Sequence, residues 1–447
     1  MHKKFSKLGY ILAMAGSAIG LGNAWKFPTM TGNHGGFAFI FLYFVLTILI
    51  ACVAFLAEAG IGRLSGKDTP KALIELAPKG QRFWGLGGFF MITALLIASF
   101  YLVVIGWILY YACLSIGGLP ASTDEAGKLF DSLIKNNLTS VLSCYFAVLF
   151  ITFYTVSRGI KEGIEKLNFI LMPSLFILLI VILIYSFTFN SSGFSGAVSF
   201  IFTPDFSKIL DPELILAAMG LALFSLSLGV GTVSTYGASL GEDTNLFKSL
   251  LYIVGLNICM GILMGLVVFS FVQVAPGASA NDGPGLIFVS LASLFGELGA
   301  VGSVLGFMFF ISLLFAGITS AVSMIEPAVR YFEDEKGISR IKSSAILGIL
   351  VFGLGVLCVL SFYEPTKDSF AIFGKSIFDI LDYATSNVLM PLGVLFFSIF
   401  AGWIMPKERF YTLFLNYAPK FAVDIWYFIL RFILPILVVG IGIYRLN

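Results

Sequence analysis

The chain has 447 residues, of which 58% are hydrophobic and 12% are charged, and its mean hydropathy is +0.98. These values lie far outside the range of soluble domains and predict a polytopic membrane protein. The net charge of +2 gives no indication of nucleic-acid binding. The five cysteines have no metal-like spacing, and the two histidines are too few for a metal or acid-base centre.

Eleven apolar segments have the length of membrane helices. They cover about 8–31, 37–62, 84–116, 140–157, 163–187, 213–240, 246–274, 300–332, 343–362, 370–402 and 423–444. The N-terminal HKKFSK runs into the first segment without a small-residue cleavage site, so we expect no removable signal peptide. Lysine and arginine are more frequent in the loops on the N-terminal side of the membrane, which predicts a cytoplasmic N-terminus and an outer C-terminus.

Three loops are longer than turns. The two outer loops, 188–212 and 275–299, carry apolar residues as well as turn residues, and we expect them to fold back onto the helices as lids. The basic inner loop 63–83 is expected to be a solvated cytoplasmic face.

The stretch GYILAMAGSAIGLGNAWKFP, residues 9–28, predicts a membrane helix that is interrupted in its middle. Gly16, Ser17, Gly20 and Gly22 crowd that region with poor helix formers. Carbonyl groups left unpaired inside a bilayer are tolerated only where protein or a wet cavity satisfies them. Their oxygens suit a hard cation such as sodium, and the start of the second half-helix suits a carboxylate. The alternative is a glycine-rich face against which a neighbouring helix packs.

The segment 213–240 repeats this feature in FSLSLGVGTVSTYG. It places Ser225, Ser227, Gly229, Gly231 and Thr232 in mid-membrane. The two interrupted segments are five spans apart, which is the spacing of two inverted repeats with a binding site at their interface. We therefore predict a single all-α domain over 1–447, with repeats 8–187 and 213–402 followed by a helix at 423–444.

Further polar residues fall at the same membrane depth. Thr319 and Ser320 are adjacent hydroxyls one turn after Ala316, and Asn257 lies in an otherwise apolar run. Neutral oxygen groups of this kind suit sodium better than a transition metal. Taken singly, however, a serine or threonine in a membrane helix usually bonds to its own backbone.

Ionisable residues inside the predicted spans are functional or paired by default. They are Lys26, Glu58, Glu326, Asp379 and Asp382. We expect Lys26 and Asp382 to pair across an outer vestibule. Glu58 lies close in sequence to Arg63, which favours a structural role at the inner end of its helix.

Six motifs, in this order along the chain, resemble those of the neurotransmitter:sodium symporter family. They are the stretch at 9–28, GIEKLNFILMP, FSLSLGVG, NDGPGLIFVSL, FAGITS and LDYATSNVLMPLG. The resemblance runs from about Gly9 to the end of the chain. The eleven helices resemble the shorter bacterial branch, which implies the fold of the leucine-transporter-like members.

The resemblance implies two sodium sites. The first, shared with the substrate carboxylate, would use Ala18, Asn23, Ser225 and Asn257, with Ser225 in place of the more familiar threonine. The second would use the carbonyls of Gly16, Ile19 and Ala316 with the hydroxyls of Thr319 and Ser320.

It also implies a substrate site at the two interruptions, where Tyr101 would hold the carboxylate. The residues expected to contact the substrate are Ser17, Ala18, Gly20, Leu21, Gly22, Ile97, Tyr101, Phe224, Ser225, Ser227, Val230, Ser320, Ser323 and Met324. This pocket has no charged side chain, so a neutral hydrophobic or aromatic amino acid is expected.

The outer gate implied by the resemblance is the ion pair of Lys26 and Asp382, with lysine where arginine is usual. Lysine keeps the charge but lacks the planar fork of arginine. Tyr101 and Phe224 would close over the substrate beneath it.

The inner gate departs further from the family. Asp334 matches an acidic gate residue, but the usual N-terminal arginine is absent, and Lys3 or Lys4 would substitute. Gly163 and Pro173 have the spacing of the family's helix-unwinding motif, which would open an inner water path to the second sodium site.

The chloride site of the family is incomplete. Tyr43 matches its tyrosine, but Leu221 and Gly261 stand where a glutamine and a serine or acidic residue are usual. We therefore expect weak or no chloride dependence. Glu326 is a candidate proton carrier, although pairing with an inner-gate group is favoured.

The resemblance implies a sodium-coupled symporter of the bacterial inner membrane that imports an amino acid by alternating access. An enzyme is not expected, because no nucleophile–base pair or metal cluster occurs in the sequence. The alternatives are a membrane sensor that binds an amino acid without transport and a symporter of another small zwitterion. The sequence leaves the oligomeric state open.

Overall fold

The computed structural model describes residues 4–241, 244–272 and 285–446 of the chain. These residues form helices and connecting turns and contain no β-strand, apart from one isolated bridge between Ile372 and Lys375. The predicted all-α class is therefore confirmed.

Nine helical segments in the described residues are long and apolar enough to cross a membrane. They are Phe37–Ser65, Arg82–Gly117, Leu138–Ser157, Ile160–Phe189, Leu246–Val272, Gly299–Lys336, Arg340–Leu360, Ile377–Ile404 and Lys420–Ile443. The predicted boundaries agree to within a few residues except at the start of the tenth segment, which was expected at 370. There the helix begins only at Ile377, because Ser376 caps it by accepting a hydrogen bond from the backbone N–H of Asp379 at 3.0 Å.

The two remaining predicted segments are divided into short pieces. Segment 8–31 consists of α1 (Lys7–Ala18), a π-helical turn and α2 (Phe27–Asn33). Segment 213–240 consists of α11 (Pro212–Ser225) and α12 (Thr232–Ala238). Both predicted interruptions are thus present as breaks in the helical backbone.

The other helices follow in chain order. They are α3 (Phe37–Leu46), α4 (Cys52–Ser65), α5 (Thr69–Leu76), α6 (Met91–Gly117), α7 (Thr123–Asn136), α8 (Leu138–Ser157), α9 (Lys166–Phe189), α10 (Ser191–Phe202), α13 (Leu246–Val272), α14 (Ala292–Glu297), α15 (Gly299–Lys336), α16 (Arg340–Leu360), α17 (Ile377–Tyr383), α18 (Met390–Ile399), α19 (Lys407–Phe414), α20 (Lys420–Phe428) and α21 (Leu434–Leu446). Short π-helical turns at Gly22–Lys26, Thr47–Ala51, Ile160–Glu165, Leu286–Leu291, Ala384–Leu389, Phe400–Ile404 and Ile429–Ile433, and 3₁₀ segments at Arg82–Phe90 and Lys367–Ser369, connect or extend them.

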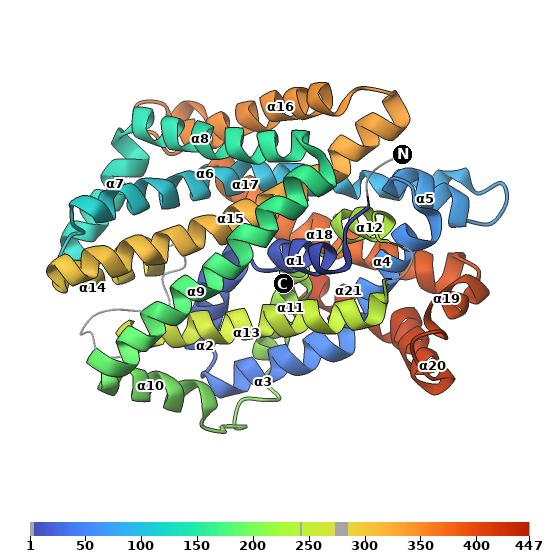
Figure 1. The fold of residues 1–447 in the computed structure, drawn as a ribbon, viewed down its shortest axis with the longest axis horizontal. Helices are drawn as coiled ribbons and strands as arrows, with labels where there is room; N and C mark the ends of the chain where they lie inside the picture. Colours follow the sequence, from blue (N-terminus) through green and yellow to red (C-terminus); the bar gives the residue numbers. More distant parts are fainter. Residues whose placement is uncertain (1–3, 242–243, 273–284, 447) are drawn as a thin grey trace.

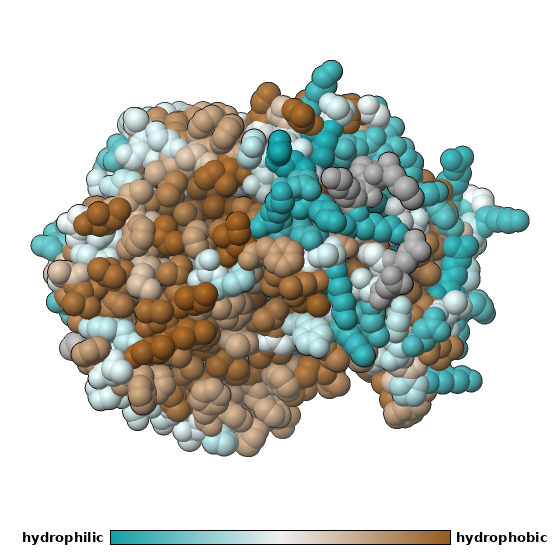
Figure 2. Space-filling model, viewed as in Figure 1, coloured by the Kyte–Doolittle hydropathy of each residue, from teal (hydrophilic) through white to brown (hydrophobic). Residues whose placement is uncertain are grey.

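The helices are arranged as a bundle with two distinct ends. In Figure 1, α7, α10 and α14 lie at one end, and the N-terminus, α5 and α19 lie at the other. Figure 2 shows hydrophobic side chains over much of this face and hydrophilic ones gathered towards the end that carries α5. Both loops expected to be lids contain helix, α10 in one and α14 in the other, while residues 275–284 of the second loop lie outside the described residues.

The helices α4 and α12 approach each other closely through two glycines. A β-carbon at Gly237 of α12 would lie 2.5 Å from the carbonyl oxygen of Ala59, and one at Gly62 of α4 would overlap the carbonyl oxygen of Ser234. Small residues allow this approach between membrane helices. The contact holds α12, which begins at the second interruption, against the C-terminal half of α4.

Substituting Gly62→Ala is expected to destabilise the folded protein by about 1–3 kcal/mol, because the added methyl group overpacks this contact. The measurement is the apparent melting temperature of the purified chain in detergent, which should fall. Gly353→Ala in α16 is the matched control, since a β-carbon there meets no atom within 4 Å. Equal melting temperatures for the two variants would contradict the close packing of α4 and α12.

Candidate functional site

The first break, residues 19–21, separates α1 from the π-helical turn that starts at Gly22. Ile19 still donates its N–H to the carbonyl of Ala15 at 2.7 Å, but its ψ of 84° leaves the helical region. The chain becomes helical again where Asn23 donates its N–H to the carbonyl of Gly20 at 3.0 Å. The regular helical ladder is therefore interrupted within a few residues, as the cluster of glycines predicts.

The second break, residues 226–231, separates α11 from α12. Ser227, Gly229 and Gly231 have φ values of 54°, 79° and 76°, in the left-handed region that only glycine adopts without strain. The side chain of Glu58 on α4 accepts hydrogen bonds from the N–H of Gly229 at 2.9 Å and of Gly231 at 3.1 Å. A buried carboxylate thus satisfies two of the donors that the break exposes.

Glu58 makes structural contacts, as its position near Arg63 in the sequence favours, but its partners lie at the second break and not at Arg63. Its carboxylate contacts the second break, and Arg63 donates instead to the carbonyls of Leu240 and Gly241, at 3.1 and 2.6 Å. The sequence signal for such a role is the single carboxylate in the apolar run CVAFLAEAG, which requires nearby donors but does not identify them.

Serine hydroxyls join the two breaks to each other and to α15. Ser227 donates to the carbonyl of Ser17 at 3.1 Å, and the Ser17 hydroxyl donates to Oγ of Ser227 at 3.0 Å. From α15, Ser320 donates to the carbonyl of Gly16 at 2.8 Å, and Ser323 lies 2.7 Å from the Ser17 hydroxyl. The end of α1 is therefore held by hydrogen bonds with the second break and with α15.

A small cavity of about 30 Å³ lies between the breaks. It is lined by Ser17, Ala18, Gly20, Gly22, Ala94, Ile97, Tyr101, Phe224, Ser225, Ser227, Val230, Ser320, Met324 and Met390, none of which is charged. Two of the predicted substrate contacts, Leu21 and Ser323, do not line the cavity. Both bond to residues that do: the N–H of Leu21 donates to the Tyr101 hydroxyl at 3.0 Å, and the Ser323 hydroxyl donates to that of Ser17. Ala94 and Met390 were missed; Ala94 lies one turn before Ile97 on the same helical face.

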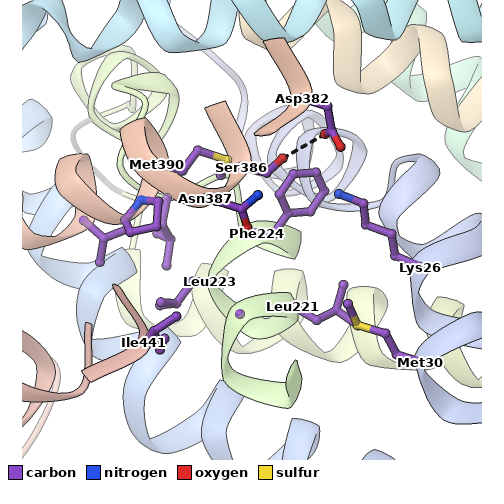
Figure 3. A pocket seen from close by; sticks show the side chains of 14 residues that line it. Lys26, Met30, Leu221, Leu223, Phe224, Asp382, Ser386, Asn387, Met390 and Ile441 are labelled. Atoms are coloured by element: carbon purple, nitrogen blue, oxygen red, sulfur yellow. Dashed lines mark hydrogen bonds between the residues drawn. The ribbon is translucent and has the colours of Figure 1, made fainter. Parts of the chain in front are cut away.

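Two larger cavities, of about 200 and 260 Å³, lie next to this one and share Lys26, Phe224 and Asp382. Figure 3 shows the side chains of these residues in the first of them. The Lys26 ammonium lies 4.3 Å from the centre of the Phe224 ring, a cation–π contact, and Asp382 accepts a hydrogen bond from Ser386 at 3.0 Å. Phe224 and Tyr101 line both the small cavity and one of the larger ones, so their side chains lie between them.

The residues of the first predicted sodium site lie together. Asn257 donates to the hydroxyl of Ser225 at 3.2 Å, and Asn23 donates to Oδ1 of Asn257 at 2.8 Å. Ala18 lines the small cavity together with Ser225. The side-chain oxygen of Asn23 is buried and has no hydrogen-bond partner among the described residues. A buried, unpaired neutral oxygen in this set fits a hard cation.

The residues of the second predicted site also converge. Ser320 bonds to the carbonyl of Gly16, and the hydroxyl of Thr319 donates to the carbonyl of Ala316 at 3.0 Å. A β-carbon at Gly16 would lie 3.0 Å from Cβ of Thr319, so α1 and α15 touch at this point. Ile19, buried and one residue beyond the end of α1, presents its carbonyl within the first break. The donor set is again neutral oxygen, which fits sodium.

At the position of the family's chloride site, the described side chains are engaged with one another. The hydroxyl of Tyr43 accepts from Asn257 at 2.8 Å and lies 3.0 Å from the hydroxyl of Ser225. Gly261 faces Phe27, whose Cε2 would lie 3.1 Å from a β-carbon at that position. Leu221 lines the first of the larger cavities.

At the end of the bundle that carries α5, the carboxylate of Asp334 accepts from the guanidinium of Arg330 on the same helix, at 3.3 Å. Arg330 also donates to the hydroxyl of Ser239 at 2.5 Å and to the carbonyl of Gly66 at 2.8 Å. This arginine links α15 to the end of α12 and the end of α4, a role that the sequence reasoning missed. Lys3, one of the two predicted partners of Asp334, lies outside the described residues.

Three further predicted residues, Glu326, Gly163 and Pro173, have defined surroundings. The buried carboxylate of Glu326 is paired with Arg340 at the start of α16, so it is a paired charge within the membrane. The motif from Gly163 to Pro173 is wound here: Gly163 lies in the π-helical turn Ile160–Glu165, and α9 continues through Pro173.

Comparison with known proteins places the chain in a family. The model described as the sodium:neurotransmitter symporter family matches residues 2–129 and 132–447. The chain is 37% identical to an uncharacterized sodium-dependent transporter, YhdH, of Bacillus subtilis (strain 168), over 97% of this chain and 95% of that one. It is 24% identical to the sodium- and chloride-dependent taurine transporter of Bos taurus, over 92% of this chain and 72% of that one.

Among solved structures, the crystal structure of MhsT in complex with L-phenylalanine matches the fold with a TM-score of 0.87 and 35% identity, covering 99% of both chains. The family predicted from the six motifs is thereby confirmed, and with it a multi-pass membrane protein that is a transporter and not an enzyme. The chain belongs to the sodium:neurotransmitter symporter family.

Proposed function

We propose that this protein couples inward sodium flow to the import of a neutral hydrophobic or aromatic amino acid by alternating access. The observation that carries the proposal is the cavity between the two breaks, which is lined by backbone, hydroxyls and apolar side chains. Backbone N–H groups and hydroxyls can bind the amino and carboxylate groups of an amino acid, while an uncharged pocket disfavours a charged side chain.

The substrate class is supported from two sides. The cavity is lined by Ile97, Phe224, Val230 and Met324, which suit an apolar side chain. The matching structure of MhsT contains L-phenylalanine. The small volume of about 30 Å³ requires that Phe224 and its neighbours move outward before a substrate of that size can enter. Another small zwitterion remains the second candidate, because relatives of the chain include taurine transporters.

Both sodium sites enter the proposal as assigned from the sequence. The first comprises Ala18, Asn23, Ser225 and Asn257 with the substrate carboxylate, so substrate and ion would each raise the affinity of the other by the same factor. The second comprises the oxygens of Gly16, Ile19, Ala316, Thr319 and Ser320. The support is the convergence of these neutral oxygens, one of them a buried and unpaired amide oxygen.

The proposed architecture has eleven membrane helices in one domain, with inverted repeats 8–187 and 213–402 and a final helix at 423–444. The nine spanning segments and the two broken ones support this count. We assign the end that carries the N-terminus and α5 to the cytoplasm of a bacterial cell, and the C-terminus to the outer side. The basic loop 63–83 and the hydrophilic surface at that end support the orientation.

The gates follow from the same arrangement. Lys26 and Asp382 would form the outer gate above Phe224 and Tyr101. At the inner side, Arg330 and Asp334 would hold α12 closed, with Lys3 or Lys4 as additional cations. Gly163 and Pro173 would allow α9 to unwind in another state of the cycle.

Transport is proposed to be independent of chloride. The described residues at the corresponding position offer no cationic group, and a carboxylate in place of Gly261 would press on the ring of Phe27. Asn257 donates its side-chain NH₂ to the hydroxyls of Tyr43 and Ser225 there, so the donors of this amide are already used.

Uptake into proteoliposomes tests the proposal. With an inward sodium gradient, we expect concentrative uptake of one or more amino acids from a labelled neutral panel that includes taurine. Uptake should be lost when potassium replaces sodium. It should be unchanged when gluconate replaces chloride. Binding without uptake would favour the sensor. Selective uptake of taurine would favour the second substrate class, and a fall in gluconate would overturn the chloride assignment.

The double substitution Thr319→Val with Ser320→Ala should abolish sodium-dependent uptake, because it removes two hydroxyl oxygens from the second site. Ser312→Ala is the control, since this buried hydroxyl on the same helix bonds only locally, to the carbonyl of Phe309 at 2.6 Å. Unchanged sodium dependence in the double variant would contradict the second site.

Substituting Tyr101→Phe should weaken substrate binding by about tenfold or more, as expected for a lost hydrogen bond to a charged group. The measurement is the substrate concentration at half-maximal binding in sodium buffer. Tyr111→Phe on the same helix is the matched control, since its buried hydroxyl has no partner in the described residues. If both variants bind like the parent protein, Tyr101 does not hold the carboxylate.

A further inference from the structure

A buried amide oxygen lies where α1, α9 and α15 meet. The side chain of Asn168 on α9 is 1% exposed, and its Nδ2 donates to the carbonyl of Ile164 at 2.8 Å. Its Oδ1 is buried and has no hydrogen-bond partner among the described residues. Because buried polar atoms are almost always paired, this oxygen requires an explanation.

The oxygen lies against Gly16, one of the residues of the proposed second sodium site. A β-carbon at Gly16 would overlap Oδ1 of Asn168, and the same β-carbon would lie 3.0 Å from Cβ of Thr319. Asn168 therefore approaches α1 at the residue whose carbonyl accepts the hydroxyl of Ser320. The glycine at position 16 leaves room for this approach.

The direction of the amide is fixed by its surroundings. The carbonyl of Ile164 can only accept, so the group that faces it must be the NH₂, and the group that faces Gly16 must be the oxygen. One turn earlier on the same side of the helix, Glu165 accepts from the N–H of Ser6 at 3.0 Å and from its hydroxyl at 2.7 Å. The start of α1 is thus tied to the chain that carries Asn168.

We propose that Oδ1 of Asn168 is an additional ligand of the second sodium site. This inference rests on the proposed function, which supplies the ion. A neutral amide oxygen belongs to the same donor class as the carbonyls and hydroxyls already assigned there. Asn168 lies between Gly163 and Pro173, so unwinding of α9 would withdraw a ligand and favour release of the ion.

The test is the stabilisation of the purified full-length chain by sodium, with potassium holding the ionic strength constant. The readout is the sodium concentration that gives half of the maximal rise in melting temperature, which needs no transport. Asn168→Leu removes the oxygen at similar volume and should raise this concentration about tenfold, the lower end of losses seen when supporting groups of a metal site are removed. Asn168→Asp keeps an oxygen and adds charge, so it should retain or tighten sodium binding.

Asn416→Leu is the matched control. Asn416 makes the same type of bond to the carbonyl four residues earlier, at 3.4 Å from Thr412, but it is exposed and far from α1 in sequence. This variant should respond to sodium like the parent chain. In the background of Thr319→Val with Ser320→Ala, Asn168→Leu should cause no further loss, because the site is already absent.

An unchanged sodium response in Asn168→Leu would overturn the assignment. So would weaker sodium binding in both Asn168 variants, if each variant also weakened it further when added to Thr319→Val with Ser320→Ala. The oxygen would then be served by water or have a packing role. If Asn168→Leu fails to fold, Asn168→Asp decides: sodium binding at least as tight as in the parent chain supports the ligand, and weaker binding opposes it. A parent chain that does not respond to sodium would instead count against the proposed function itself.

Discussion

The structure depends on satisfying backbone groups that two broken helices expose at membrane depth. Hydrocarbon offers these groups no partner, so each break must be completed by other parts of the protein. The carboxylate of Glu58 takes the N–H groups of the second break, and the hydroxyls of Ser227 and Ser320 take carbonyls at the end of α1. Neither break would be tolerated without the other helices. The hydrogen bonds that satisfy the two breaks form a polar centre in an apolar bundle.

The same chemistry explains why the centre suits an ion and an amino acid. Carbonyls, hydroxyls and amides can form hydrogen bonds with one another in the absence of a ligand, and they can bind a ligand when one is present. Ser17 illustrates this, since its carbonyl and hydroxyl both bond to neighbouring serines in this structure. An ion or ammonium group can replace such bonds, because neutral oxygens can coordinate a cation.

Much of the fold and of the candidate site could be predicted from the sequence, because hydropathy locates spans and glycine clusters locate breaks. The residues that the resemblance assigned to the first sodium site do lie together, as Asn23, Ser225 and Asn257 show. What sequence could not supply was the partner of a buried charge. Glu58 was placed with its sequence neighbour Arg63, while its actual donors lie more than 170 positions away. The role of Arg330 was missed for the same reason: its partners Ser239 and Gly66 lie at the ends of helices distant in sequence.

The close contact of α4 with α12 has a mechanical consequence. Gly62 and Gly237 leave no space in which the two helices could slide apart gradually, and Glu58 ties α4 to the N-terminal end of α12. Interfaces packed in this way separate or stay together but deform little. The C-terminal half of α4 and the short helix α12 therefore form one rigid unit, and Arg330 binds the C-terminal end of α12 to α15. A displacement of the break between α11 and α12 would be transmitted through this unit to the contact of Ser239 with Arg330.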